Sequence, residues 1–157
     1  MRLSAQEEYG LRCLIHLAEA TRSGSLTISE IAERESLTTA HAAKVMRLLR
    51  KAGLVQSVRG QHGGYRLSRR PEELRLSELL EALDEPLHTC ACERYSGREA
   101  ECVHAGDCSI RSLWLGADRL FHEFFSTWTL ADLSCTERTM TRRINRQLTR
   151  LPGLSTR

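Results

Sequence analysis

Residues 28–67 read ISEIAERESLTTAHAAKVMRLLRKAGLVQSVRGQHGGYRL, and this stretch decides the fold. The spacing of its apolar residues predicts a short helix at 28–34. A second helix is predicted to begin at Thr38 or Thr39 and to end at Lys51, after a tight turn. Two helices joined by such a turn are typical of a helix-turn-helix motif.

A hairpin is predicted directly after the second helix. Gly53 suits the helix end, because glycine readily adopts the left-handed backbone conformation found there. Residues 54–58 have a strand pattern, 59–64 form a glycine-rich turn, and 65–68 form the returning strand. A helix-turn-helix followed by a hairpin predicts a winged DNA-binding unit.

The rest of the chain is predicted to be mainly helical. Ser4 and Glu7 form a capping-box pattern that opens a helix through about Ala20. A short helix is expected from Ser77, its N-cap, to Leu83. The elements divide the chain into four parts. Residues 1–76 form a winged helix-turn-helix unit, and residues 77–108 form a short helix with a cysteine-bearing loop. Residues 109–135 form a dimerisation helix with a short tail, and residues 136–157 form a basic, flexible end.

Charge is distributed unevenly along the chain, although the net charge is only +3. Residues 34–70 contain nine lysines and arginines against a single acid, Glu35. Residues 72–107 contain ten acids against three arginines. A basic block that coincides with a helix-turn-helix pattern favours a polyanionic partner.

Several other classes are excluded by what the sequence lacks. It has no nucleophile elbow, phosphate-binding loop or metal-hydrolase motif, so we do not expect an enzyme. No apolar run approaches the roughly 20 residues that span a bilayer, and the first residues lack the apolar core of a signal peptide. A cytoplasmic protein without membrane contact is expected.

Duplex DNA is the expected partner of the winged unit. The second helix of such a motif places its N-terminal residues at base edges in the major groove. The residues expected to face the groove are Thr38, Thr39, His41, Ala42, Lys44 and Arg47, whereas Val45, Leu48 and Leu49 are expected in the core. The wing offers Arg59, Gln61 and His62 beside Gly60, Gly63 and Gly64, whose missing side chains let the backbone approach DNA.

A long amphipathic helix is predicted from Ser109 to about Trp128. It carries five of the eight aromatic residues of the chain. Because helix-turn-helix proteins that bind operators act as twofold dimers, we expect this helix to form a homodimer interface and the operator to be palindromic.

Four cysteines occur within nineteen residues of the segment before this helix, at Cys90, Cys92, Cys102 and Cys108. Disulfides are disfavoured in a reducing cytosol, so the cluster indicates a metal or redox site. An iron–sulfur cluster, a metal-free thiol switch and structural zinc all remain open, although zinc sites favour closer cysteine pairs. Cys13 and Cys135 are expected to be buried small apolar residues.

These motifs together resemble the bacterial winged-helix regulators typified by the iron–sulfur repressor IscR and the nitric-oxide-sensing repressor NsrR. The resemblance covers about residues 1–134. It rests on the cysteines before the long helix and on the segments EYGLR at 8–12, LLRKAGLV at 48–55, RGQHGGYRL at 59–67 and TLADL at 129–133.

The resemblance implies a [4Fe–4S] or [2Fe–2S] cluster held by Cys92, Cys102 and Cys108. It also implies a fourth ligand, which could be Glu8 of the first helix, from this or a partner subunit; Cys90 competes for that role. The alternative for Glu8 is an ion pair with Arg12, one helical turn away.

The sequence departs from the family pattern at three points. Nine residues separate Cys92 from Cys102, where relatives with a cluster have shorter spacing. Arg111 stands where IscR-like members have a histidine, and Glu8 stands where NsrR-like members have an aspartate. The type of cluster therefore stays open.

The function that follows is DNA-binding transcriptional regulation, most simply repression. The cluster would sense nitric oxide, redox state or the supply of clusters. The sequence does not decide among these signals, nor whether the protein binds DNA with or without its cluster.

Overall fold

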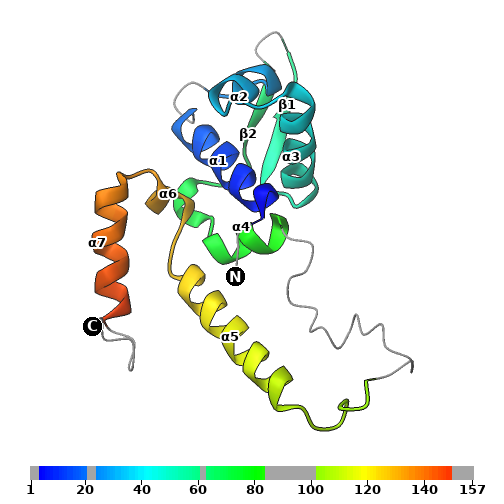
Figure 1. The fold of residues 1–157 in the computed structure, drawn as a ribbon. Helices are drawn as coiled ribbons and strands as arrows, with labels where there is room; N and C mark the ends of the chain where they lie inside the picture. The colour runs from blue at the N-terminus through cyan, green and yellow to red at the C-terminus, as the bar shows by residue number, and fades with distance from the viewer. Residues whose placement is uncertain (1–3, 21–23, 61–62, 84–101, 150–157) are drawn as a thin grey trace.

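The computed structural model describes residues 4–20, 24–60, 63–83 and 102–149. Helices dominate, and two strands form one antiparallel hairpin (Figure 1). The elements are α1 (Ala5–Glu19), α2 (Ile28–Arg34), α3 (Thr39–Lys51), β1 (Val55–Val58), β2 (Gly64–Leu67), the 3-10 helix η2 (Pro71–Glu73), α4 (Leu76–Leu83), α5 (Ser109–Ser126), α6 (Leu130–Leu133) and α7 (Glu137–Leu148). The predicted fold class, a mainly helical winged helix-turn-helix with a long helix beyond it, is confirmed.

The helix-turn-helix consists of α2 and α3, which pack against each other. Thr27 and Glu30 form a capping box at the start of α2. Ser36 adopts a φ of 52° in the turn, and the Leu37 amide donates to the carbonyl of Ala32 at 2.8 Å. These bonds satisfy backbone groups that the helix ends would otherwise leave unpaired.

The wing is the hairpin of β1 and β2, in which Val55 pairs with Leu67 and Val58 with Gly64. Leu26 extends this sheet on the far side of β2, because it exchanges two backbone hydrogen bonds with Tyr65, at 2.7 and 3.0 Å. A Cβ atom at Gly64 would lie 2.4 Å from the Leu26 carbonyl oxygen. Glycine at this position therefore permits the wing to pair with the segment before α2.

The core lies where α1, α3 and α4 meet under the hairpin. Its largest fully buried side chains are Leu14, Ile31, Met46, Leu49, Leu54, Leu74, Leu79, Leu83 and Leu130. Gly10 lets α4 approach α1, because a Cβ atom there would lie 2.3 Å from a methyl group of Leu83. We call this unit, comprising residues 4–83 and α6, the head.

The C-terminal end of α5 is fixed to the head by backbone hydrogen bonds. The Leu76 amide donates to the Trp128 carbonyl at 3.0 Å, and the Leu130 amide donates to the Leu74 carbonyl at 2.8 Å. Trp128 and Leu130 are buried in the core. The rest of α5 extends away from the head (Figure 1).

One local expectation is wrong. Ser77 does not cap α4: the helix begins at Leu76, and Ser77 is buried in its first turn. The bond from the Leu76 amide to Trp128 satisfies a backbone donor that an N-cap would otherwise serve. The predicted long helix is present, from Ser109 to Ser126, against an expected end near Trp128.

The basic segment after residue 135 was expected to be frayed, but residues 137–148 form α7. Thr136 caps this helix by accepting a hydrogen bond from the Thr139 amide at 3.3 Å. Met140 and Ile144 pack against the core. Such tertiary contacts stabilise a helix whose sequence alone is a marginal helix former. Residues 150–157 lie outside the described residues.

Among the residues that the structure describes, no helix is both long enough and apolar enough to cross a bilayer.

Candidate nucleic-acid interface and cysteine site

One face of α3 is exposed and basic. Lys44 and Arg47 project from it, and neither forms an ion pair with any residue that the structure describes. Thr39 and His41 are exposed on the first turn of the same helix. Free cationic side chains beside small hydrogen-bonding side chains suit phosphate contact and base recognition together.

The N-terminus of α3 is capped by Thr38, whose hydroxyl oxygen accepts a hydrogen bond from the His41 amide at 3.2 Å. Thr38 is itself exposed. The cap fixes the first turn of α3, and the positive end of the helix dipole lies there. This part of the helix therefore favours an approaching phosphate.

Ala42 does not face outward, contrary to expectation. It is fully buried, together with Val45, Met46 and Leu49. Ala42 precedes Val45 by three residues and Met46 by four, so all three share the core side of α3. The groove-facing set therefore excludes Ala42 and keeps Thr38, Thr39, His41, Lys44 and Arg47.

Tyr9 of α1 contacts the exposed face of α3, a contact that the sequence did not reveal. Its ring meets the His41 ring edge to face, with centroids 5.1 Å apart and planes at 71°. Tyr9 is partly buried against the core. The His41 ring is therefore oriented from α1. Tyr9 lies in the segment at 8–12 and His41 in the predicted DNA-contacting helix, and only the packing of α1 on α3 brings the two residues together.

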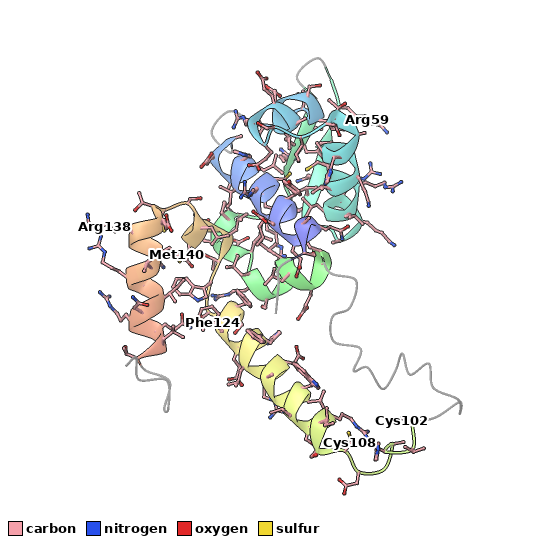
Figure 2. The ribbon with its side chains drawn as sticks, in the orientation of Figure 1. Arg59, Cys102, Cys108, Phe124, Arg138 and Met140 are labelled. Atoms are coloured by element: carbon pink, nitrogen blue, oxygen red, sulfur yellow. The ribbon has the colours of Figure 1, made fainter. Side chains whose placement is uncertain are left out.

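The tip of the wing carries Arg59, which is exposed on the surface of the head (Figure 2). Gly60 has a φ of 119°, and the Gly63 amide donates to its carbonyl at 2.9 Å. A Cβ atom at Gly63 would lie 2.7 Å from the Val58 carbonyl oxygen. Gly63 and Gly64 thus have a structural role in the hairpin. Gln61 and His62 lie outside the described residues.

Cys102 and Cys108 lie at the N-terminal end of α5, far from α3 (Figure 2). Both are partly buried free thiols. Cys108 is the N-cap of α5, and its sulfur accepts a hydrogen bond from the Arg111 amide at 3.4 Å. Cys90 and Cys92 fall outside the described residues. Two soft sulfur donors on one short loop suit iron–sulfur or zinc binding as well as thiol chemistry.

Arg111 holds the loop between these cysteines. Its guanidinium donates to the carbonyls of His104 and Ala105, at 2.9 and 2.6 Å. The Ala105 amide in turn donates to the Cys102 carbonyl at 2.9 Å. Arg111 thus supports the loop that carries the two described thiols.

Glu8 forms the ion pair with Arg12 that was the alternative to metal binding, at 2.6 Å. Arg12 also lies 3.6 Å from Glu35. Because α1 belongs to the head and the cysteine loop lies at the far end of α5, this chain alone does not bring Glu8 to Cys102 and Cys108 (Figures 1 and 2). Within the described ranges, no group of three or more His, Cys, Asp or Glu side chains could hold a metal ion.

The remaining two cysteines differ from each other. Cys13 is fully buried in α1, as expected, and burial, helped by the charge of Glu35, raises the pKa of its thiol to about 12. It therefore stays protonated and is a poor nucleophile or metal ligand. Cys135 was expected to be buried, but it is exposed in the turn between α6 and α7. The packing of Met140 and Ile144 starts only beyond this turn.

A known family model matches residues 3–136, and its description is "Iron-dependent Transcriptional regulator". The chain belongs to the Rrf2 family. The match includes the head, the cysteine segment, α5 and α6, and it ends one residue before α7.

Known Rrf2 proteins agree with this assignment. The protein rrf2 of Nitratidesulfovibrio vulgaris is 31% identical over 133 residues, which cover 85% of this chain and 87% of that protein. The solved structure of IscR from T. potens is 28% identical, with a TM-score of 0.66 and 85% of each chain covered. The solved structure of CymR from B. subtilis, described as a global cysteine regulator, is 27% identical and has a TM-score of 0.67. The match covers 85% of this chain and 96% of that chain.

The Rrf2 relatives confirm the resemblance inferred from the sequence, and they are transcriptional regulators rather than enzymes. Regulation of transcription through a winged helix-turn-helix is therefore the activity of this family member.

Proposed function

We propose that this Rrf2 protein is a cytoplasmic repressor that binds a palindromic operator through α3 and the wing, and that an iron–sulfur cluster controls its binding. The exposed face of α3, whose cations have no ion-pair partner among the described residues, carries the proposal. Lys44 and Arg47 would bind DNA phosphates, whereas Thr39 and His41 would read base edges. Arg59 of the wing would enter the adjacent minor groove.

The proposed cluster would be held by Cys92, Cys102 and Cys108. The family description as iron-dependent supports it, and so does the position of two thiols at one end of a long helix. When bound, such a cluster supplies a reactive iron centre that oxidants or nitric oxide can attack. Cys90 or the Glu8 side chain of a partner subunit would complete the ligand set, and in the second case the Arg12 pair would have to open.

A metal-free thiol switch is the second proposal. It is supported by the similarity to CymR and by the partial burial of Cys102 and Cys108 as free thiols. Oxidation of one thiol and condensation with a second would form a disulfide and release water, with a peroxide as the oxidant.

A homodimer through α5 is also proposed. Its exposed apolar residues form an unusually large surface for a soluble chain, with exposed fractions between 41% and 69%: Ile110, Leu113, Trp114, Leu115, Leu120 and Phe121. A second copy of α5 would bury this surface and would place two α3 helices on one operator.

The dimer is tested by light scattering at micromolar concentration. We expect the wild type to be dimeric, and L113E/L120E to be monomeric, because two carboxylates would be placed in the proposed apolar interface. R119E, an exposed change at an already polar position of α5, should leave the dimer intact. A monomeric wild type, with and without its cluster, would contradict the interface.

Control of DNA binding is proposed to pass along α5. The cysteine loop lies at the N-terminal end of this helix, and its other end is joined to the head by hydrogen bonds to Leu74 and Leu76. A change in the loop would therefore alter how α5 meets the head and the position of α3. Such coupling amounts to a few kcal/mol at most.

The decisive experiment is a DNA titration with three forms of the protein: anaerobic and intact, treated with nitric oxide, and stripped of metal. The duplex would be selected from a random library by each form in turn. We expect the intact and stripped forms to differ at least tenfold in affinity. Equal affinity in all three forms would leave a DNA-binding regulator whose cysteines do not control it.

A further inference from the structure

The helix α7 presents a row of arginines that no part of the described chain neutralises. Arg138, Arg142 and Arg146 recur at four-residue steps and are all exposed. None of them forms an ion pair with a described residue. Like charges at this spacing destabilise a helix by a few tenths of a kcal/mol per pair. The row therefore weakens α7 in isolation and is suited to a polyanion.

The opposite side of α7 fixes the direction in which this row points. Met140 and Ile144 pack against the core. Arg143 lies 5.1 Å from the centre of the Trp128 ring and forms an ion pair with Asp132. The Gln147 amide also donates to the Thr127 hydroxyl at 2.7 Å.

The ion pair with Arg143 is strong enough to affect Asp132. Partial burial of this carboxyl opposes its ionisation, but hydrogen bonds from Thr129 and Arg143 outweigh that effect, and the pKa of Asp132 falls below its ordinary value. The carboxylate therefore stays charged at neutral pH and keeps Arg143 in place. Arg138 consequently points away from the body of the protein (Figure 2).

We propose that the row Arg138, Arg142 and Arg146 binds the phosphate backbone of a second duplex DNA segment, separate from the one held by α3. Four residues of helix rise about 6 Å. Each strand of a duplex offers one phosphate per ~3.4 Å of axis, so each guanidinium can reach a different phosphate. Contacts of this kind carry no sequence information.

The geometry distinguishes this DNA segment from the operator. The helices α3 and α7 lie on opposite sides of the chain (Figure 1). Arg138 points away from the body on the side opposite α3, so the arginine row faces away from a duplex held on α3 (Figures 1 and 2). The family match ends at residue 136, so α7 adds a surface to the Rrf2 unit.

A membrane is a poorer partner for α7. A helix that binds a bilayer surface inserts an apolar face between the lipid headgroups. Two of the three large apolar side chains of α7, Met140 and Ile144, are already engaged with the head, and the third, Leu148, is partly buried. An acidic protein is the other class of partner, and its irregular charges match an evenly spaced row less well than phosphates do.

The test uses the full chain and a mixed-sequence 30-base-pair duplex. The duplex is fixed to beads and saturated with protein, and capture of a second, fluorescent copy is measured. We expect R138Q/R142Q/R146Q to lower this capture at least tenfold. A plot of log affinity against log salt concentration has a negative slope. In the glutamine variant this slope should be shallower than in the wild type by about 0.9 for each phosphate that is no longer neutralised.

Two controls separate phosphate binding from other effects. R138K/R142K/R146K keeps the charge and should retain capture, whereas R75Q/R119Q removes charge elsewhere and should not change it. Circular dichroism checks that α7 still folds. Capture by the glutamine variant within twofold of the wild type would overturn the proposal and would leave an acidic protein as the partner of α7.

The proposal of a second duplex rests on the proposed role of α3 in holding the first one, and direct binding of a single duplex distinguishes a failure of α7 from a failure of α3. In a K44A/R47A background, α7 alone should still bind the 30-base-pair duplex, and adding the three glutamines should abolish that binding. If instead K44A/R47A has no effect while the glutamine variant does, the assignment of α3 fails and that of α7 stands.

Discussion

K44A/R47A is expected to bind its selected duplex about 100-fold more weakly than the wild type, because removing each phosphate-binding side chain costs ~1–2 kcal/mol. Both side chains are exposed and form no ion pair with a described residue, so their removal leaves the fold intact. The salt slope should fall together with the affinity. Fluorescence anisotropy of the labelled duplex at several salt concentrations measures both quantities.

The matched control is R75A. Arg75 is exposed and lies just before α4, in the segment that bonds to α6. Its removal lowers the net charge, as K44A/R47A also does, but leaves α3 unchanged, so affinity should stay within about twofold of the wild type, because salt screens exposed charges that do not contact the DNA. If K44A/R47A binds as tightly as R75A, the duplex contacts a surface other than α3.

C102S and C108S are each expected to give colourless protein after anaerobic purification, whereas the wild type should be brown. A serine hydroxyl is a much poorer ligand for iron than a thiolate. Cys108 also caps α5, but serine is itself a favourable N-cap, so C108S retains the helix start. Loss of colour would thus reflect the missing ligand. Iron and acid-labile sulfide provide the quantitative measurement.

C135S is the control for these variants, because Cys135 is exposed and lies far from the N-terminal end of α5. Its iron content should match that of the wild type. Zinc without iron or sulfide in the wild type would favour a structural metal site. Neither metal would favour the thiol switch, and peroxide should then form a disulfide that non-reducing mass spectrometry detects.

Elements that depend on local chemistry could be predicted from the sequence. The Ser4–Glu7 capping box is present, with the Glu7 amide 3.2 Å from the Ser4 hydroxyl. Gly53 has a φ of 75° at the end of α3, as a helix-terminating glycine requires. These signals act over three or four residues, and so they can be recognised without knowledge of the fold.

Features that depend on tertiary contacts could not be predicted in the same way. Met140, Ile144 and Leu148 recur at four-residue steps, which permits a marginal helix, but the sequence does not show that Met140 and Ile144 reach the core and stabilise α7. The burial of Ala42 is different, because it could have been predicted: Ala42 lies three residues before Val45, which the sequence places in the core. Small residues suit both core and surface, so the residue type alone did not decide it.

The candidate site was predictable in its parts but not in its arrangement. Lys44, Arg47, Cys102 and Cys108 were identified by residue type and motif. Two contacts depend on the tertiary structure. The Tyr9 ring packs on the His41 ring, and Arg111 donates hydrogen bonds to the loop that carries the cysteines. No spacing rule within the sequence predicts either contact.

The way α5 leaves the head has a mechanical consequence. Its 18 residues form a rod about 27 Å long, anchored near Trp128 and carrying Cys102 and Cys108 at the other end. A lever of this length converts a displacement of about 2.4 Å at the end that carries the cysteines into a tilt of only about 5° at the anchor, by simple geometry from the same rise per residue. Movements of the cysteine loop would therefore reach the head as small rotations of α5, transmitted through the backbone hydrogen bonds that Trp128 and Leu130 form with Leu76 and Leu74.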